Sequence, residues 1–133
     1  MYEIAKYFIE FAKELVGLGT TLQKADLERR IRLAQHIENI SKCLEDIAQS
    51  FRDNHQPYKS CGELDEYVYS LPDVCEGMVD DSAIRRLVDL LSHRAHGRAV
   101  TFIGTDDVQK KEESNLMDQA AGQMRAFAST LKV

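Results

Sequence analysis

The sequence contains no tryptophan and few of the residues that interrupt helices. Its 133 residues include only two Pro and seven Gly, which excludes collagen-like and low-complexity compositions. The three Cys are odd in number and lack CxxC spacing, which fits reduced thiols better than a disulfide framework. A chain of this length normally forms one domain with its own core. We therefore expect a single domain over residues 1–133, either a complete protein or the N-terminal module of a longer one.

Long apolar runs are also absent. No stretch approaches the roughly 20 apolar residues that cross a bilayer, so we expect no membrane partner. The apolar core that a secretory signal requires is interrupted by charges such as Glu3, Lys6 and Glu10. With the reduced thiols, these absences predict a cytoplasmic protein.

Positive charge is scarce in the middle of the chain. The whole chain has a net charge of −5, and residues 56–81 hold one basic and seven acidic side chains. Nucleic acids bind mainly through Lys and Arg that neutralise phosphates, so we do not expect a nucleic-acid partner. The acidic segment predicts a solvated face or a docking surface for a basic protein.

Helical periodicity is the main positive signal. Apolar residues recur at steps of four and three in three long segments, which is typical of helices that pack along one face. These positions are Ile4, Phe8, Phe11, Leu15 and Leu18; Leu33, Ile37, Ile40, Leu44, Ile47 and Phe51; and Met117, Ala120, Met124, Phe127 and Leu131. Two shorter apolar sets lie between them. The sequence therefore predicts an all-α fold, a single antiparallel helical bundle with three long helices and two short ones.

Local signals predict where these helices begin and end. Gly17 and Gly19 end the first helix, and the capping box Thr20-x-x-Gln23 begins a second that runs to about Phe51.

A second capping box, Ser60-x-x-Glu63, begins a short third helix that Pro72 stops or kinks. Asp80 or Asp81 caps the fourth helix, and Gly97 closes it.

The last helix is expected to start at Thr105 or Asp106, after a connection over residues 100–104 that places Phe102 in the core. Its first turns, residues 109–113, are polar all round, and we expect them to project into solvent.

The first helix is apolar over more than one packing face. Tyr7, Ile9 and Val16 extend its apolar stripe to more than half of the circumference. Such a helix is either central to the bundle or covered by another subunit, so a homo-oligomer is one predicted outcome.

Several sequence motifs that are typical of catalytic or cofactor-binding sites are missing. The sequence has no Glu-x-x-His pair for a di-iron site, no Cys-x-x-Cys-His for haem, no phosphate-binding Gly-rich loop and no Gly-x-Ser-x-Gly elbow. We therefore expect no cofactor and no metal.

The strongest remaining candidate for a functional cluster is His93-Arg94-Ala95-His96-Gly97-Arg98. Its simplest interpretation is structural, because cationic side chains complement the negative end of a helix and Gly97 can cap it. The segment also resembles the His-x-x-Lys-Gly pattern of histidine phosphotransfer domains. That resemblance implies that His93 accepts a phosphoryl group and that Gly97 gives a partner clearance. His96 stands where that family has Lys, and Arg94 or Arg98 would supply the missing charge.

A weaker resemblance is to HEPN ribonucleases, helical bundles that carry an Arg four to six positions before a His. His96-Gly97 is similar to that pattern, but no Arg lies at the required distance from it. Arg86 and His93 have six residues between them, but Leu87 takes the position that is usually polar, and Arg30 with His36 also satisfies the bare spacing. An acidic chain also offers little attraction to RNA.

Two metal sites remain weaker alternatives. Cys61, Cys75, His93 and His96 would supply zinc ligands, but the cysteines sit singly and far apart. The acidic residues between Glu63 and Asp81 lack the alternating ligands of a calcium loop.

The sequence therefore predicts a non-enzymatic adaptor or regulatory module that binds protein. The predicted interaction surface is Tyr7, Ile9 and Val16 on the first helix and Glu63, Asp65 and Glu66 on the third. The alternative is phosphotransfer through His93, and the more remote one is a HEPN-like ribonuclease.

Overall fold

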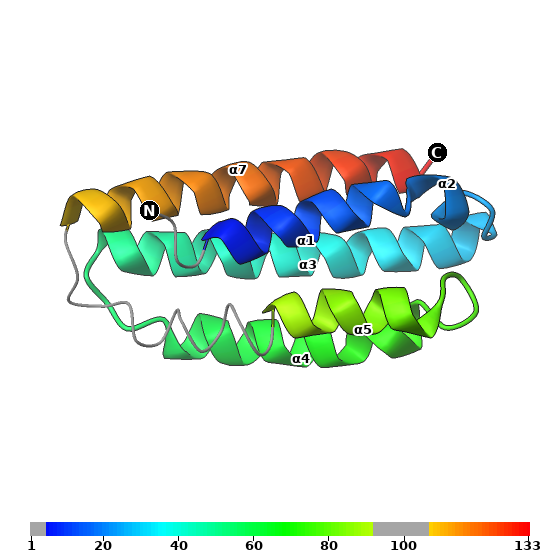
Figure 1. Ribbon diagram of the computed structural model, residues 1–133, viewed down its shortest axis with the longest axis horizontal. Helices are drawn as coiled ribbons and strands as arrows, with labels where there is room; N and C mark the ends of the chain where they lie inside the picture. The colour runs from blue at the N-terminus through cyan, green and yellow to red at the C-terminus, as the bar shows by residue number, and fades with distance from the viewer. Residues whose placement is uncertain (1–4, 92–106) are drawn as a thin grey trace.

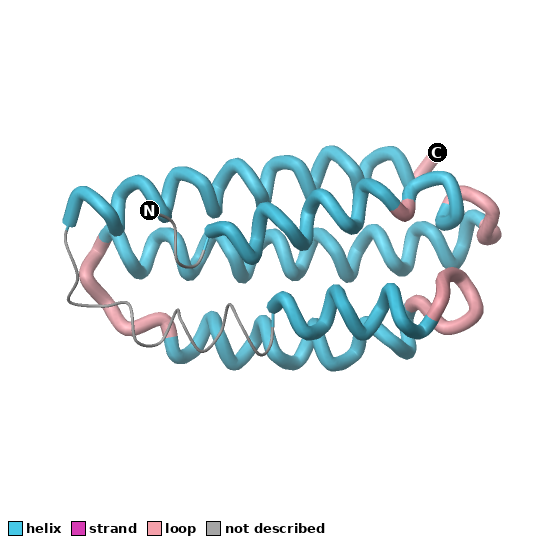
Figure 2. The backbone as a smooth tube through the Cα atoms, in the orientation of Figure 1, coloured by secondary structure: helices cyan, strands magenta, loops and turns pink. Residues whose placement is uncertain are grey.

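The computed structural model describes residues 5–91 and 107–133, most of which are helical (Figure 1). In chain order the helices are α1 (Ala5–Gly17), α2 (Gly19–Leu22), α3 (Leu27–Arg52), α4 (Tyr58–Val74), α5 (Asp81–Asp89) and α7 (Asp107–Leu131). The described ranges contain no strand (Figure 2). They also contain no helix that is both long and apolar enough to span a bilayer. The predicted all-α bundle is confirmed.

Helices α3 and α7 form the central pair. They run antiparallel and side by side (Figure 1), and their contact is more extensive than that of any other two described helices. The predicted apolar stripe of each helix is buried. On α3 it comprises Leu33, Ile37, Ile40, Leu44, Ile47 and Phe51, and on α7 Met117, Ala120, Met124, Phe127 and Leu131. Burying one such large side chain contributes about 1.5–3 kcal/mol.

A second buried stripe on each of these helices consists of small residues. On α3 it is Ala34, Ser41 and Ala48, and on α7 it is Ser114, Ala121 and Ala128. Neighbouring members are seven residues apart on both helices, and all six residues are fully buried. Because the separation of packed helices depends on the side chains between them, these small residues let α3 and α7 approach closely.

Three ion pairs join α3 to α7 and to Lys132, the residue that follows α7. They are Glu38–Lys132 at 2.5 Å, Glu45–Arg125, and Arg52–Asp118 at 2.6 Å. From one pair to the next, the residue number on α3 increases by seven and the residue number of its partner decreases by seven. Exposed pairs of this kind contribute only about 0–1 kcal/mol each. Their regular spacing therefore reports the register of the two helices more than it stabilises them.

The remaining helices pack around this pair. Helix α1 lies against α7, α4 lies against α3, and α5 packs on α4 with a smaller contact to α1. Figure 1 shows α4 and α5 as a layer beside the α1, α3 and α7 group. One continuous apolar core joins all of these helices.

The start of the long second helix was predicted wrongly. Thr20 lies inside the short helix α2 and is exposed, and α3 begins only after Asp26. The Asp26 carboxylate accepts a hydrogen bond from the backbone N–H of Arg29 at 2.9 Å. A charged N-cap acceptor satisfies a free N–H at the helix start. The chain turns between the two helices and buries Leu22.

Helix α4 is longer than the predicted third helix. It begins at Tyr58 rather than at Ser60, and it continues through Pro72 to Val74. The carbonyl of Leu71 still accepts a hydrogen bond from Cys75 N at 3.0 Å. Proline removes its own N–H from the ladder and crowds the carbonyl four residues earlier, and α4 continues for only two residues beyond Pro72. At the next helix, Asp80 rather than Asp81 is the N-cap residue.

Several predicted boundaries fall on residues that the structure does not describe. These are the closure at Gly97, the connection over 100–104 with Phe102, and the start at Thr105 or Asp106.

Candidate functional site

The predicted phosphotransfer cluster lies outside the described residues. His93, Arg94, His96, Gly97 and Arg98 all belong to the range 92–106. Phosphotransfer through His93 therefore stays a prediction, as does the ribonuclease alternative that uses the same His.

The Arg30–His36 pair does not form a site. The guanidinium of Arg30 donates to Gln23 Oε1 at 2.8 Å and to the carbonyl of Val133 at 2.7 Å. His36 instead faces α4, where its Nε2 hydrogen-bonds to the carbonyl of Tyr67 and its ring meets the Tyr67 ring edge-on at 5.6 Å. Burial lowers the pKa of His36, and the hydrogen bond to Tyr67 partly opposes this. A neutral imidazole that joins α3 to α4 has a structural role.

Arg86, the other predicted ribonuclease arginine, lies on α5 and is paired with α1. Its Nε is 2.7 Å from Glu14 Oε1, and its Nη2 is 4.0 Å from Glu10 Oε1. These contacts connect α5 to α1.

The three cysteines lie in the core, whereas the other two residues of the zinc alternative, His93 and His96, lie outside the described residues. Cys43, Cys61 and Cys75 are all buried and reduced. Burial raises the pKa of Cys43 and Cys61 to about 12 and that of Cys75 to about 11. Such thiols stay protonated at neutral pH and are poor metal ligands. Within residues 5–91 and 107–133, no three His, Cys, Asp or Glu side chains converge on a point that could hold a metal.

The prediction that the first turns of α7 project into solvent is only partly right, because Lys111 and Glu112 are exposed whereas Lys110 and Glu113 are buried. Lys110 and Glu113 are 5% and 0% exposed, and Ser114 is fully buried. The reason is register: counting back from Met117 in steps of four and three, Glu113 and Lys110 occupy core positions. The polar groups there are bonded to the protein, as buried polar groups usually are.

Each of these polar side chains has an identified partner. Glu113 Oε2 accepts a hydrogen bond from the backbone N–H of Ala5 at 2.7 Å. The hydroxyl of Ser114 donates to the carbonyl of Lys110 at 2.7 Å, and Lys110 Nζ donates to Asn54 Oδ1. The cluster thus links α7 to the first residue of α1 and to the turn after α3.

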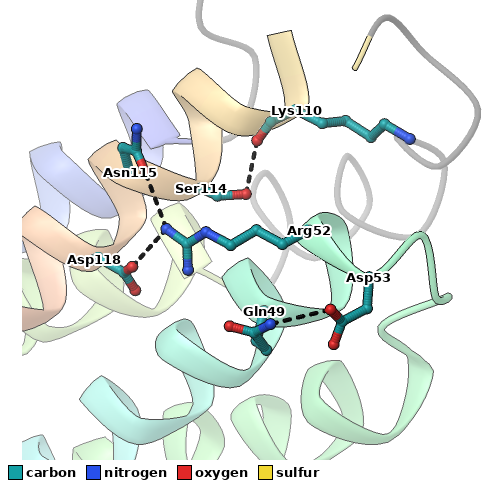
Figure 3. Close-up of polar contacts among 7 residues, drawn as sticks. All are labelled: Gln49, Arg52, Asp53, Lys110, Ser114, Asn115 and Asp118. Atoms are coloured by element: carbon teal, nitrogen blue, oxygen red, sulfur yellow. Dashed lines mark hydrogen bonds and ion pairs between the residues drawn. The ribbon is translucent and has the colours of Figure 1, made fainter. Parts of the chain in front are cut away.

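A hollow of about 330 Å³ lies beside this cluster and is lined by Phe51, Arg52, Asn54, Lys110 and Lys111. Two of its cations, Arg52 and Lys110, point apart (Figure 3). Arg52 is engaged by Asn115 Oδ1 at 3.1 Å and Asp118 Oδ2 at 2.6 Å. We therefore interpret this end of the bundle as a structural joint.

The predicted surface on α1 is only partly exposed. Tyr7 and Ile9 are half-buried against the core, whereas Val16 is 52% exposed. Val16 borders a groove of about 510 Å³ between α1 and α7. Ala12 and Phe127 form its buried floor. The other lining residues are Lys13, Gln123, Ala126 and Thr130.

Two of the three predicted acidic residues of α4 face solvent. Glu63 and Glu66 are exposed, and Asp65 is half-buried. Two tyrosines that the sequence reasoning missed, Tyr58 and Tyr69, are 64% and 58% exposed on this helix. Their separation of eleven residues is almost a whole number of helical turns, and this spacing was the available signal.

We expect the three cysteines to resist alkylation in the native protein and to react together once denaturant unfolds it. Because their folded-state pKa values exceed the ordinary value of 9.0, the unfolded chain loses thiol protons first as the pH rises. The pH-dependent contribution of these thiols to the free energy of unfolding is complete below pH 9.0 and is lost as the pH rises toward 12. Thiol titration with a chromogenic disulfide checks the first expectation, and rapid labelling of the folded protein would contradict it.

Replacing Glu113 with Ala should lower the free energy of unfolding by about 1–3 kcal/mol, because the Ala5 N–H loses its acceptor inside the protein. Glu113→Gln keeps an acceptor oxygen and should lose less. The neighbouring Glu112 is exposed, so Glu112→Ala should stay within about 0.5 kcal/mol of wild type. Urea denaturation measures all three variants, and equal stability of Glu113→Ala and Glu112→Ala would refute the buried contact.

Comparison of the chain with protein-family models, with curated proteins and with solved structures finds no match.

Proposed function

We propose that this protein is a non-catalytic helical module that binds an amphipathic helix of another protein in the groove between α1 and α7. The observation that carries this proposal is the exposed apolar lining of that groove. Val16 is 52% exposed, and Ala126 is exposed on the facing helix. Exposed apolar surface that is gathered into a groove is typical of an interaction site.

The shape of the groove favours a helix as its occupant. Ala12 and Val16 are one turn apart on α1, and Gln123, Phe127 and Thr130 follow one another by a turn on α7. Two parallel walls of this length accept the i, i+4 ridge of a third helix.

The rim suggests the chemistry of the partner. Among the described residues that line the groove, Lys13 is the charged one, and Gln123 and Thr130 add neutral polar groups. A partner helix with a leucine ridge and a flanking carboxylate would pair with Lys13 and bury the apolar floor.

The test uses a labelled helical peptide with a leucine ridge flanked by glutamates. Val16→Asp should weaken its binding about tenfold, because a desolvated carboxylate would then face the ridge. Leu27→Asp is the control, since Leu27 is 46% exposed at the start of α3 and away from the groove. Fluorescence anisotropy measures both variants.

Three outcomes separate the possible occupants. Selective loss of peptide binding in Val16→Asp supports the proposal. A wild-type dimer that Val16→Asp dissociates in sedimentation, without peptide binding, would show that a second copy covers the groove instead. Equal peptide affinity of both variants would contradict the proposal.

A further inference from the structure

The outward side of α4 combines two exposed aromatic rings with exposed carboxylates. Tyr58 and Tyr69 project from the same side of the helix, since eleven residues complete about three turns. At 1.5 Å per residue, they stand about 16 Å apart along the axis. Glu66 and Asp73 are exposed on the adjoining part of the same side. We call Tyr58, Gly62, Glu66, Tyr69 and Asp73 the α4 outer face.

Gly62 leaves a notch between the two tyrosines. It is exposed in the interior of α4, and a Cβ added there would meet no atom within 4 Å. A glycine in a helix interior is destabilising relative to alanine, and no contact in the described chain requires it. The notch lets another chain approach the α4 backbone closely.

The charge of this face has no internal counterpart in the residues that the structure describes. No ion pair joins Glu63, Glu66 or Asp73 to a described cation, whereas acidic residues of α1 and α3 are paired with Arg86, Arg125 and Lys132. Residues 56–81 contain seven acidic side chains and one basic one. Unpaired carboxylates favour a ligand of opposite charge.

We propose that the α4 outer face binds a basic segment of a partner protein. Its Lys or Arg side chains would lie over the rings of Tyr58 and Tyr69, where aromatic faces attract cations. Glu66 and Asp73 would pair with neighbouring cations, and the partner's backbone would pass over Gly62. Two rings three turns apart require a ligand several residues long, which favours a peptide segment over a small cation.

This surface is separate from the α1–α7 groove, and the proposal does not depend on the groove. Helix α3 contacts both α4 and α7, and Figure 1 shows α4 and α7 at opposite sides of the molecule. A variant of one surface should therefore leave binding at the other unchanged, so failure of one proposal is distinguishable from failure of the other.

The experiment measures the affinity of a labelled helical peptide rich in lysine, arginine and alanine by fluorescence anisotropy. We expect wild-type binding that weakens with salt. The double variant Tyr58→Ala, Tyr69→Ala should lose about tenfold in affinity. The double reversal Glu66→Lys, Asp73→Lys should lose at least as much.

Two controls separate a defined site from attraction by net charge. The reversal Asp46→Lys, Glu112→Lys changes the net charge equally at exposed positions on α3 and α7, and it should lose much less affinity. Val16→Asp in the groove should leave the affinity unchanged.

Gly62→Leu should keep the helix folded, because leucine favours helices, yet it should weaken binding by filling the notch.

The proposal is overturned by any of three results. These are equal losses in the two charge reversals, wild-type affinity in the tyrosine variant, and no measurable binding of the basic peptide to wild type.

Discussion

The close antiparallel contact of α3 with α7 is the constraint on which the rest of the structure depends. Small buried residues at seven-residue intervals, such as Ser41 and Ala121, let these helices approach closely. The apolar stripes of both helices then meet in one core, as packed interiors require. A larger side chain at such a position would force the helices apart and would disturb every helix that packs on them.

This contact also decides which surfaces are left for partners. Helix α3 is covered by α7 on one side and by α4 on another, so α4 turns its outer face to solvent. Helix α1 covers only part of α7, and the exposed remainder forms the groove beside Val16. The polar joint formed by Lys110, Glu113 and Asn54 fixes the end of α7. The two proposed binding surfaces are thus by-products of how the core is assembled.

The sequence predicted the core well because apolar spacing is itself the cause of helix packing. Every predicted apolar position of α3 is buried. Local signals were less reliable: Thr20 and Asp26 are both of the residue types that favour N-caps, and it is Asp26 that caps α3 in the folded chain.

Polar residues were the harder part of the prediction. Lys110 and Glu113 carry charges and were expected in solvent, although their heptad positions continue the apolar stripe of α7. The exposed tyrosines of α4 were missed although their spacing, compared with the apolar positions Leu64, Val68 and Leu71 of the same helix, places them on its other side. Val16 belonged to a correctly predicted apolar helix, but its exposure depends on how far α7 covers α1.

The most direct test of the α3–α7 register is a charge-swap cycle at Glu45 and Arg125, whose side chains pair between the two helices. Glu45→Arg, Arg125→Glu and the double swap would be compared with wild type by urea denaturation. The account predicts that each single reversal destabilises the protein and that the double swap restores stability, with a coupling of about 0.2–1 kcal/mol. Strictly additive effects would mean that these residues do not face each other, and the register described for the bundle would be wrong.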